Sequence, residues 1–185
     1  MRITGGVHRG RILKVPEGFE VRPTQDRVRE ALFSIIMHEI EGARFLDLFA
    51  GSGAVGLEAV SRGAVSAAFV EKSPRQVSFI RANAAMLGVS PVIVQADAYR
   101  YVSEYGGGEG FDIAFADPPY AEGAAAGFSG LLAALSDRGV VRPGGLFIAE
   151  TVPRAEAGEA SGWDLCRDRE YGRSRLIVWK RREDA

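Results

Sequence analysis

A regular alternation of short apolar segments and helical segments, beginning near Ala43, is the feature that most constrains the fold of this chain. Strands that are apolar along most of their length are typical of a parallel sheet covered by helices on both faces. The pattern predicts strands at residues 44–49, 67–71, 92–95, 111–116 and 145–150. Helical spacing falls between the strands, at residues 54–62, 74–87, 98–105 and within 124–137. We therefore expect an α/β protein with a doubly wound, mostly parallel sheet.

The beginning of the chain departs from this alternation. Residues 2–4 and 11–15 have the pattern of short strands joined through glycines, which predicts a hairpin. Apolar residues at helical spacing then continue to Ile40, and Thr24 is the expected N-cap of that helix. We expect residues 1–40 to be a small hairpin-plus-helix extension rather than an independent domain.

The end of the chain departs from the alternation as well. Residues 163–170 and 174–181 predict an antiparallel pair of strands, with a turn at residues 171–173. The α/β domain is therefore expected to span residues 41–185 and to end in an antiparallel hairpin.

The composition is that of a soluble globular domain, with 46% apolar and 25% charged residues in a chain of 185. A single cysteine, Cys166, excludes an internal disulfide. The longest apolar runs are about six residues, far short of the ~20 that span a bilayer. Charges scattered through the first residues are unlike a secretory signal, so we expect a cytoplasmic protein.

The charges are distributed unevenly along the chain. Residues 1–29 hold seven Lys or Arg and three Asp or Glu, a balance of +4. The balance is −8 for residues 30–166 and +3 for residues 167–185. Basic ends predict a surface for a polyanion if the two termini meet, and an unevenly charged solvated surface is the alternative.

A glycine-rich loop follows the first predicted strand and extends from Asp47 to Gly56. Gly51, Gly53 and Gly56 satisfy G-x-G-x-x-G in a strand–turn–helix setting, where that pattern indicates a cofactor. The glycines permit a tight turn and a close approach of a ligand to the backbone. Glu71 ends the second predicted strand, where its carboxylate can accept both hydroxyls of a ribose. The loop predicts a cofactor that contains adenosine, and a tight helix–strand crossing is the structural alternative.

Acidic side chains at the strand ends distinguish between two such cofactors. A dinucleotide presents a pyrophosphate to this loop, and Asp47 would repel that anion. S-adenosylmethionine carries an ammonium and a sulfonium, which a carboxylate attracts. Asp97 ends the third predicted strand and offers an acceptor for the adenine amino group. The acids therefore favour S-adenosylmethionine over a dinucleotide.

The fourth predicted strand ends in Asp117-Pro118-Pro119-Tyr120. Two prolines stiffen this segment and leave it rich in acceptors. Asp117 and the Pro118 carbonyl can each accept one N–H of an exocyclic amine, while Tyr120 can stack on the base. This arrangement predicts methyl transfer by alignment and polarisation, and a rigid turn that closes a strand is the alternative.

The glycine loop and the Asp-Pro-Pro-Tyr segment resemble the motifs of Rossmann-like methyltransferases that act on exocyclic amino groups. The chain start is more specific, and it resembles the RsmD family at residues 1–3, 9–11 and 22–33, with a further similarity at 171–174. The resemblance implies a seven-stranded sheet and S-adenosylmethionine, which becomes S-adenosylhomocysteine. It also implies transfer to N2 of one guanine of bacterial 16S ribosomal RNA, in a small-subunit assembly intermediate.

The expected site falls into three groups. The catalytic residues are Asp117, Pro118, Pro119 and Tyr120. The cofactor-binding residues are Asp47, Phe49, Ala50, Gly51, Ser52, Gly53, Glu71, Lys72, Asp97 and Ala98. Residues 121–127 include no basic side chain, so the expected RNA-binding residues are Arg9, Arg11, Arg22, Thr24, Arg27, Arg29 and Arg173.

Three other functions remain open at this point. An adenine-N6 DNA methyltransferase shares the motifs, although such enzymes often carry a DNA-recognition domain for which this chain has no room. A nicotinamide-dependent reductase uses the same glycine pattern, and an RNA-binding assembly factor could retain the fold without turnover. His8 and His38 are too isolated to suggest a metal pair, so no metal is expected. The sequence has no heptad pattern of the kind that predicts a coiled-coil partner, so we expect a monomer.

Overall fold

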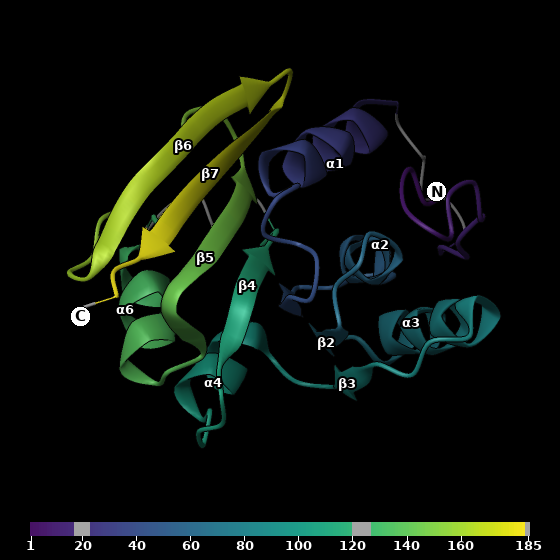
Figure 1. Ribbon diagram of the computed structural model, residues 1–185, viewed down its shortest axis with the longest axis horizontal. Helices are drawn as coiled ribbons and strands as arrows, with labels where there is room; N and C mark the ends of the chain where they lie inside the picture. Colours follow the sequence, from purple (N-terminus) through teal and green to yellow (C-terminus); the bar gives the residue numbers. More distant parts are fainter. Residues whose placement is uncertain (17–22, 120–126, 184–185) are drawn as a thin grey trace. The chain divides into compact units, whose positions relative to one another are not determined.

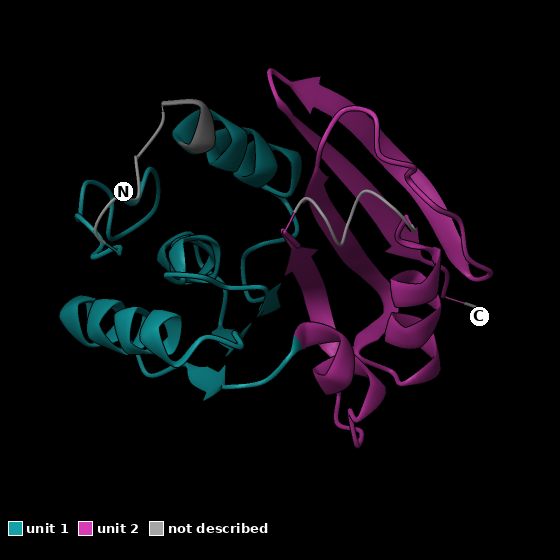
Figure 2. Cartoon of the chain, turned by 180° about the vertical axis from the view of Figure 1, so that it is seen from behind, with its two compact units in different colours: residues 1–97 teal, residues 98–185 magenta. Residues whose placement is uncertain are grey.

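The computed structural model describes residues 1–16, 23–119 and 127–183. Its seven strands belong to one sheet of mixed direction, which confirms the expected fold class. The chain divides into two compact units, residues 1–97 and 98–185, which are described in turn (Figure 2). In the described part of the chain, no helix is long and apolar enough to cross a membrane.

The first unit alternates helices with three parallel strands (Figure 1). Its strand order is β3-β2-β1, so each strand lies beside the one that follows it in sequence. The elements are α1 (Pro23–Ile35), β1 (Arg44–Leu48), α2 (Ala54–Ser61), β2 (Ser66–Val70), α3 (Pro74–Leu87) and β3 (Val92–Val94). Because the strands are parallel, the ends of β1, β2 and β3 share one edge of the sheet, and that edge carries the predicted cofactor residues.

The second unit combines one parallel pair with the expected antiparallel hairpin. Its strand order is β4-β5-β7-β6, with β7 antiparallel to both of its neighbours. The elements are α4 (Ala98–Ser103), β4 (Phe111–Ala116), α6 (Ser129–Asp137), β5 (Val141–Thr151), β6 (Trp163–Tyr171) and β7 (Ser174–Arg181). An aromatic cluster fills its core, where the Phe147 ring stacks on Trp179 at 5.5 Å and Phe128 lies 5.7 Å from Trp179.

The N-terminal arm, residues 1–16, is less regular than the expected hairpin. The structure has one isolated bridge, between Arg2 and Ile12, in place of two strands. The reason is that other backbone groups of the arm bond to helices. The N–H of Val7 donates to the Ser61 carbonyl at 2.8 Å, and the N–H of Lys14 donates to a side chain on α3. The two segments still pair over a short stretch, because the N–H of Ile3 donates to the Arg11 carbonyl and the N–H of Leu13 to the Met1 carbonyl. The bonds to the helices take up backbone groups that a longer strand ladder would use.

The arm nevertheless contributes to the hydrophobic core of the first unit. Ile3 and Leu13 are at most 2% exposed and belong to one cluster with Leu57, Phe69 and Ile80. The arm is therefore packed on α2, β2 and α3 through both apolar contacts and hydrogen bonds.

The start of α1 corrects a second expectation. The helix begins at Pro23, so Thr24 lies inside the first turn and is not the N-cap. Proline is favoured at the first helical position, because the N–H that it lacks would have no partner there. The helix also ends at Ile35, earlier than expected, although Ile40 remains buried.

Candidate functional site

The cofactor loop, residues 49–53, connects β1 to α2 in an unusual backbone conformation. Phe49, Gly51 and Gly53 have φ angles of 62°, 54° and 81°. Phe49 is the one non-glycine residue with a left-handed φ among the described residues, which is a strained conformation for a side chain. A Cβ added at Gly51 would meet no atom within 4 Å, so the space beside that residue is open. Open space beside a strained turn at a strand end fits a ligand that approaches the backbone closely.

Glu71 fixes one side of this loop. One carboxylate oxygen accepts the N–H of Gly51 and the other accepts the N–H of Ser73, each at 2.8 Å. The Ala50 N–H also donates to the Val70 carbonyl at 3.0 Å, so the loop is bonded to the end of β2. Each carboxylate oxygen has two acceptor sites, so Glu71 retains capacity for the hydroxyls of a ribose.

Asp47 lies beneath the loop on β1 and is 2% exposed. Its Oδ2 accepts the N–H of Gly56 at 2.9 Å, which bonds the strand to the first turns of α2. Burial raises the pKa of Asp47 to about 7, while the Gly56 N–H lowers it and the charge of Glu71 raises it. A cation bound nearby would stabilise the ionised carboxylate, so this group can respond to a positively charged ligand.

Gly56 has a packing role. A Cβ at this position would lie 2.4 Å from Cε1 of Phe69. The third glycine of the pattern therefore allows α2 to pack closely on β2. The tight helix–strand crossing and the open loop are both present, at different glycines.

Asn83 is a loop-binding residue that the sequence analysis missed. It lies on α3, is fully buried, and its Nδ2 donates to the Ser52 carbonyl at 3.0 Å. The same side chain bonds to the backbone of Lys14 in the N-terminal arm. A polar residue between the buried Ile80 and Leu87 of an amphipathic helix was the available signal.

The remaining predicted cofactor residues follow the neighbouring strand ends. Lys72 is exposed directly after Glu71. The Ala96 N–H donates to the Glu71 carbonyl at 3.2 Å, so the segment that leads to Asp97 and Ala98 lies next to the end of β2. Asp97 is half-buried and Ala98 is buried as the first residue of α4. The first unit therefore brings its three strand-end acids to one edge of the sheet.

The predicted catalytic segment follows β4 in the second unit. Asp117 and Pro119 are exposed, whereas Pro118 is buried. Tyr120 lies outside the described residues.

Most of the predicted RNA-binding arginines within the described residues present their side chains to solvent. These exposed residues are Arg9, Arg11, Arg27 and Arg173. Arg22 and the Thr24 side chain lie outside the part of the chain that the structure describes.

Arg29 departs from this prediction. Its side chain is 5% exposed, and its Nε donates to Oε2 of the fully buried Glu58 at 2.6 Å. Its other donors bond to the Arg2 carbonyl at 2.6 Å and to Asp26 at 2.9 Å. Arg62 adds a second guanidinium to Glu58 at 2.8 Å. Arg29 therefore neutralises a buried acid and is not available for a phosphate.

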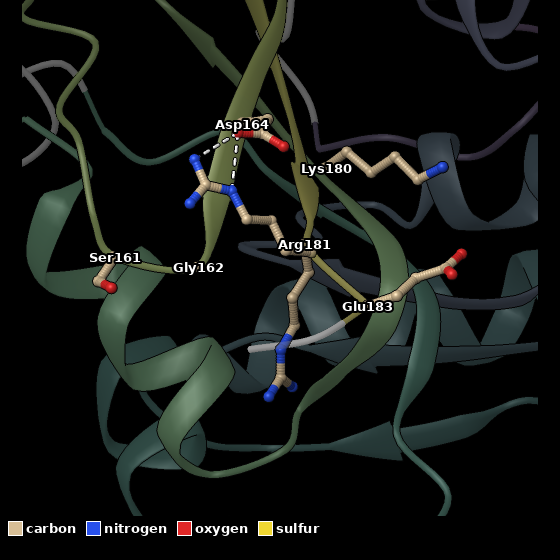
Figure 3. A pocket seen from close by; sticks show the side chains of 7 residues that line it. Ser161, Gly162, Asp164, Lys180, Arg181 and Glu183 are labelled. Carbon is tan, nitrogen blue, oxygen red and sulfur yellow. Dashed lines mark hydrogen bonds and ion pairs between the residues drawn. The ribbon is translucent and has the colours of Figure 1, made fainter.

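A pocket of about 630 Å³ lies in the second unit, where β6 begins and β7 ends (Figure 3). It is lined by Ser161, Gly162, Asp164, Lys180, Arg181, Arg182 and Glu183, and an Asp164–Arg182 ion pair of 2.7 Å crosses part of it. The guanidinium of Arg182 lowers the pKa of Asp164. None of the predicted site residues lines this pocket.

Comparison with known proteins shows which proteins this chain resembles in sequence and in structure. Ribosomal RNA small subunit methyltransferase D of Escherichia coli K12 is 35% identical over 184 residues, which cover 98% of this chain and 90% of that protein. YlbH of Bacillus subtilis is 34% identical over 187 residues and is covered completely. The solved structure of yhhF from Escherichia coli superimposes with a TM-score of 0.85 at 34% identity, covering 99% of this chain and 98% of that one.

A family described as conserved hypothetical protein 95 matches residues 1–180. The match runs from the N-terminal arm to the last strand, so it includes both units and all of the predicted site. The chain therefore belongs to this family, which is the RsmD family that its sequence resembles.

Proposed function

We propose that this protein transfers a methyl group from S-adenosylmethionine to the exocyclic N2 of a guanine in 16S ribosomal RNA. The observation that carries the proposal is the loop geometry, in which Glu71 and Asp47 flank an open turn in a chain of this family. On the resemblance to the RsmD family, we further propose that the target is guanine 966, in a partly assembled small subunit.

The residues that follow β1, β2 and β3, together with Asp47 on β1, fit the cofactor. S-adenosylmethionine supplies an electrophilic methyl group on a sulfonium. Glu71 accepts the ribose hydroxyls, and Asp97 accepts from the adenine amino group. Asp47 attracts the cationic part of the ligand, and its raised pKa makes that attraction depend on its ionisation. The other contacts are assigned to Phe49, Ala50, Gly51, Ser52, Gly53, Lys72 and Ala98.

The Asp-Pro-Pro-Tyr segment presents the amine. Asp117 and the Pro118 carbonyl each accept one N–H, with Pro119 holding the turn and Tyr120 stacking on the base. These bonds turn the nitrogen lone pair toward the methyl carbon. With the cofactor bound, the new C–N bond would form as the methyl–sulfur bond breaks with its electron pair going to sulfur, and the proton that the nitrogen then loses would pass to water. Alignment supplies most of the acceleration.

The N-terminal extension, residues 1–40, binds the RNA in this proposal, and residues 41–185 form the methyltransferase domain. Exposed Arg9, Arg11 and Arg27 support this assignment. Arg22, Thr24 and Arg173 complete the set, without Arg29. The protein acts as a monomer in the cytoplasm.

The decisive experiment measures transfer of labelled methyl from S-adenosylmethionine. The substrates are small ribosomal subunits that lack the modification, naked 16S RNA and duplex DNA. We expect label in the subunits, recovered as N2-methylguanosine after digestion. Label in DNA, or no label in any substrate, contradicts the proposal.

The role of Asp117 is tested in the same assay. Asp117→Ala should lower the rate by at least about 100-fold, because the amine loses its orienting acceptor. Asp112→Ala is a matched control, since it removes a carboxylate from the same strand, where Asp112 pairs with the half-exposed Arg142. The control should keep the wild-type rate within about twofold. Equal rates for the two variants would remove Asp117 from the site.

A further inference from the structure

Asn83 joins two segments that lie far apart in the sequence. Its Oδ1 accepts the N–H of Lys14 at 2.7 Å, and its Nδ2 donates to the carbonyls of Lys14 at 2.9 Å and Ser52 at 3.0 Å. Lys14 is 69 residues away and Ser52 is 31 residues away. One buried side chain therefore holds both the N-terminal arm and the cofactor loop.

The chemistry of the bridge requires a primary amide of this length. The two carbonyls need donors and the Lys14 N–H needs an acceptor, and the asparagine amide supplies both kinds of group. Aspartate would place an oxygen opposite each carbonyl, and an apolar residue would leave buried backbone groups without partners. Because Asn83 is fully buried, water cannot replace these bonds easily.

Each side of the bridge leads to a different ligand. On one side, the Ser52 carbonyl belongs to the cofactor loop, in which the N–H of the preceding residue, Gly51, donates to Glu71. On the other side, Lys14 continues into the arm that carries the exposed Arg9 and Arg11. A shift of the loop on cofactor binding would therefore change the bonds that fix the arm.

We propose that Asn83 is a positioning residue that couples the N-terminal arm to the cofactor loop, so that cofactor and RNA bind cooperatively. The inference rests on the proposed function for the identity of the second ligand. By linkage, a cofactor that orders the arm raises the affinity for RNA, and RNA raises the affinity for the cofactor by the same factor.

The first test is hydrogen exchange of the full-length wild-type protein with and without saturating S-adenosylhomocysteine. The reporters are the amides of Ile3 and Leu13, which donate to the carbonyls of Arg11 and Met1 within the arm. Neither amide bonds to Asn83, so the reporters follow the order of the arm. We expect S-adenosylhomocysteine to slow both amides by about fivefold or more. Unchanged exchange overturns the proposal without any variant.

The second test compares variants. Asn83→Ala removes all three bonds, and Asn83→Asp keeps the size but opposes the two carbonyls. Ser61→Ala is the matched control, because buried Ser61 also holds the arm, through Gly5 and His8, from the end of α2. In both Asn83 variants, S-adenosylhomocysteine should slow the exchange of the two reporter amides by less than about twofold. In Ser61→Ala, the ratio of exchange rates without and with S-adenosylhomocysteine should equal that of wild type. A retained ratio in Asn83→Ala overturns the proposal, as does its loss in Ser61→Ala.

The third test measures the affinity for S-adenosylhomocysteine with and without unmodified small subunits. Wild type should bind S-adenosylhomocysteine about fivefold more tightly when subunits are present. For Asn83→Ala, the subunits should raise this affinity by less than about twofold. The two proposals fail separately. Arm protection without methylation of ribosomal RNA contradicts the proposed function alone, and methylation without arm protection contradicts the coupling alone.

Discussion

At the scale of single residues, two acids that are buried in the described part of the first unit have opposite surroundings. Glu58 is surrounded by donors, from Arg29, Arg62 and Thr4. Asp47 receives the Gly56 N–H and lies near another acid, Glu71. The first arrangement stabilises structure, because the charge is compensated. The second leaves a carboxyl whose ionisation depends on its surroundings, as expected of a binding site.

Asp47 should make the stability of the protein depend on pH. Between the ordinary pKa of 3.8 and about 7, the folded protein holds a proton that the unfolded chain has lost, so stability falls as pH rises. Asp47→Asn keeps an acceptor for Gly56 and cannot ionise. The unfolding free energy of the variant minus that of wild type should grow by roughly 2–3 kcal/mol from pH 5 to pH 8. Urea titrations across this range measure it, and parallel profiles would contradict the raised pKa.

Arg29 and Arg27 are neighbours on α1 with different surroundings. Arg29→Ala removes one of two guanidinium groups from the buried Glu58, so it should lower the unfolding free energy by about 3 kcal/mol. Arg27 is exposed, and Arg27→Ala should change stability by less than about 0.5 kcal/mol. Urea unfolding of both variants checks this, and equal losses would show that the ion pair contributes nothing.

At the scale of elements, the sequence predicts the bounds of a helix best where capping residues mark both of its ends. α3 has the expected bounds because Ser73 accepts the N–H of Gln76, Pro74 occupies the first helical position, and Gly88 ends the helix at φ 69°. The N-terminal arm was predicted less well, because its backbone bonds reach Ser61 and other residues of helices far along the chain. Such partners leave no local pattern in the sequence.

The same distinction applies to the candidate site. Gly51 and Glu71 could be found because a loop, a strand and their spacing mark them. The role of Asn83 and the burial of Arg29 depend on contacts made only after α3 and α2 have packed. The sequence therefore predicts the proposed ligand-binding groups more readily than the groups that hold them in place.

The packing of α2 on β2 should be sensitive to a single methyl group. Gly56→Ala places a Cβ 2.4 Å from the Phe69 ring, so the helix must shift. We expect a loss of roughly 1–3 kcal/mol in unfolding free energy and weaker binding of S-adenosylhomocysteine. Gly130→Ala on α6 is the control, since its Cβ meets no atom within 4 Å and should stabilise by about 0.5–1 kcal/mol. Thermal unfolding of both compares them, and a neutral Gly56→Ala would show that the helix can move freely.

At the scale of the whole molecule, a chain with a net charge of −1 must concentrate its positive charge to bind RNA. The exposed arginines of the arm provide such a concentration within residues 1–29, where the balance is +4. Binding through phosphates releases counterions, so the affinity should fall steeply with salt. The salt dependence therefore counts all phosphate contacts, among which the proposed function includes those of the arm.

Replacing Arg9 and Arg11 together by alanine should make the negative slope of log affinity against log salt shallower by about 1.5. Each lost phosphate contact lowers the magnitude of this slope by about 0.7–0.9. The affinity for unmodified small subunits, measured at several salt concentrations, gives this slope. The control replaces Arg100 and Arg138, exposed arginines of equal charge on α4 and at the end of α6. Both double variants lose the same net charge, so a general electrostatic effect would change the two slopes equally. If the arm itself contacts phosphates, the Arg9 and Arg11 variant has the shallower slope and the Arg100 and Arg138 variant keeps the wild-type slope.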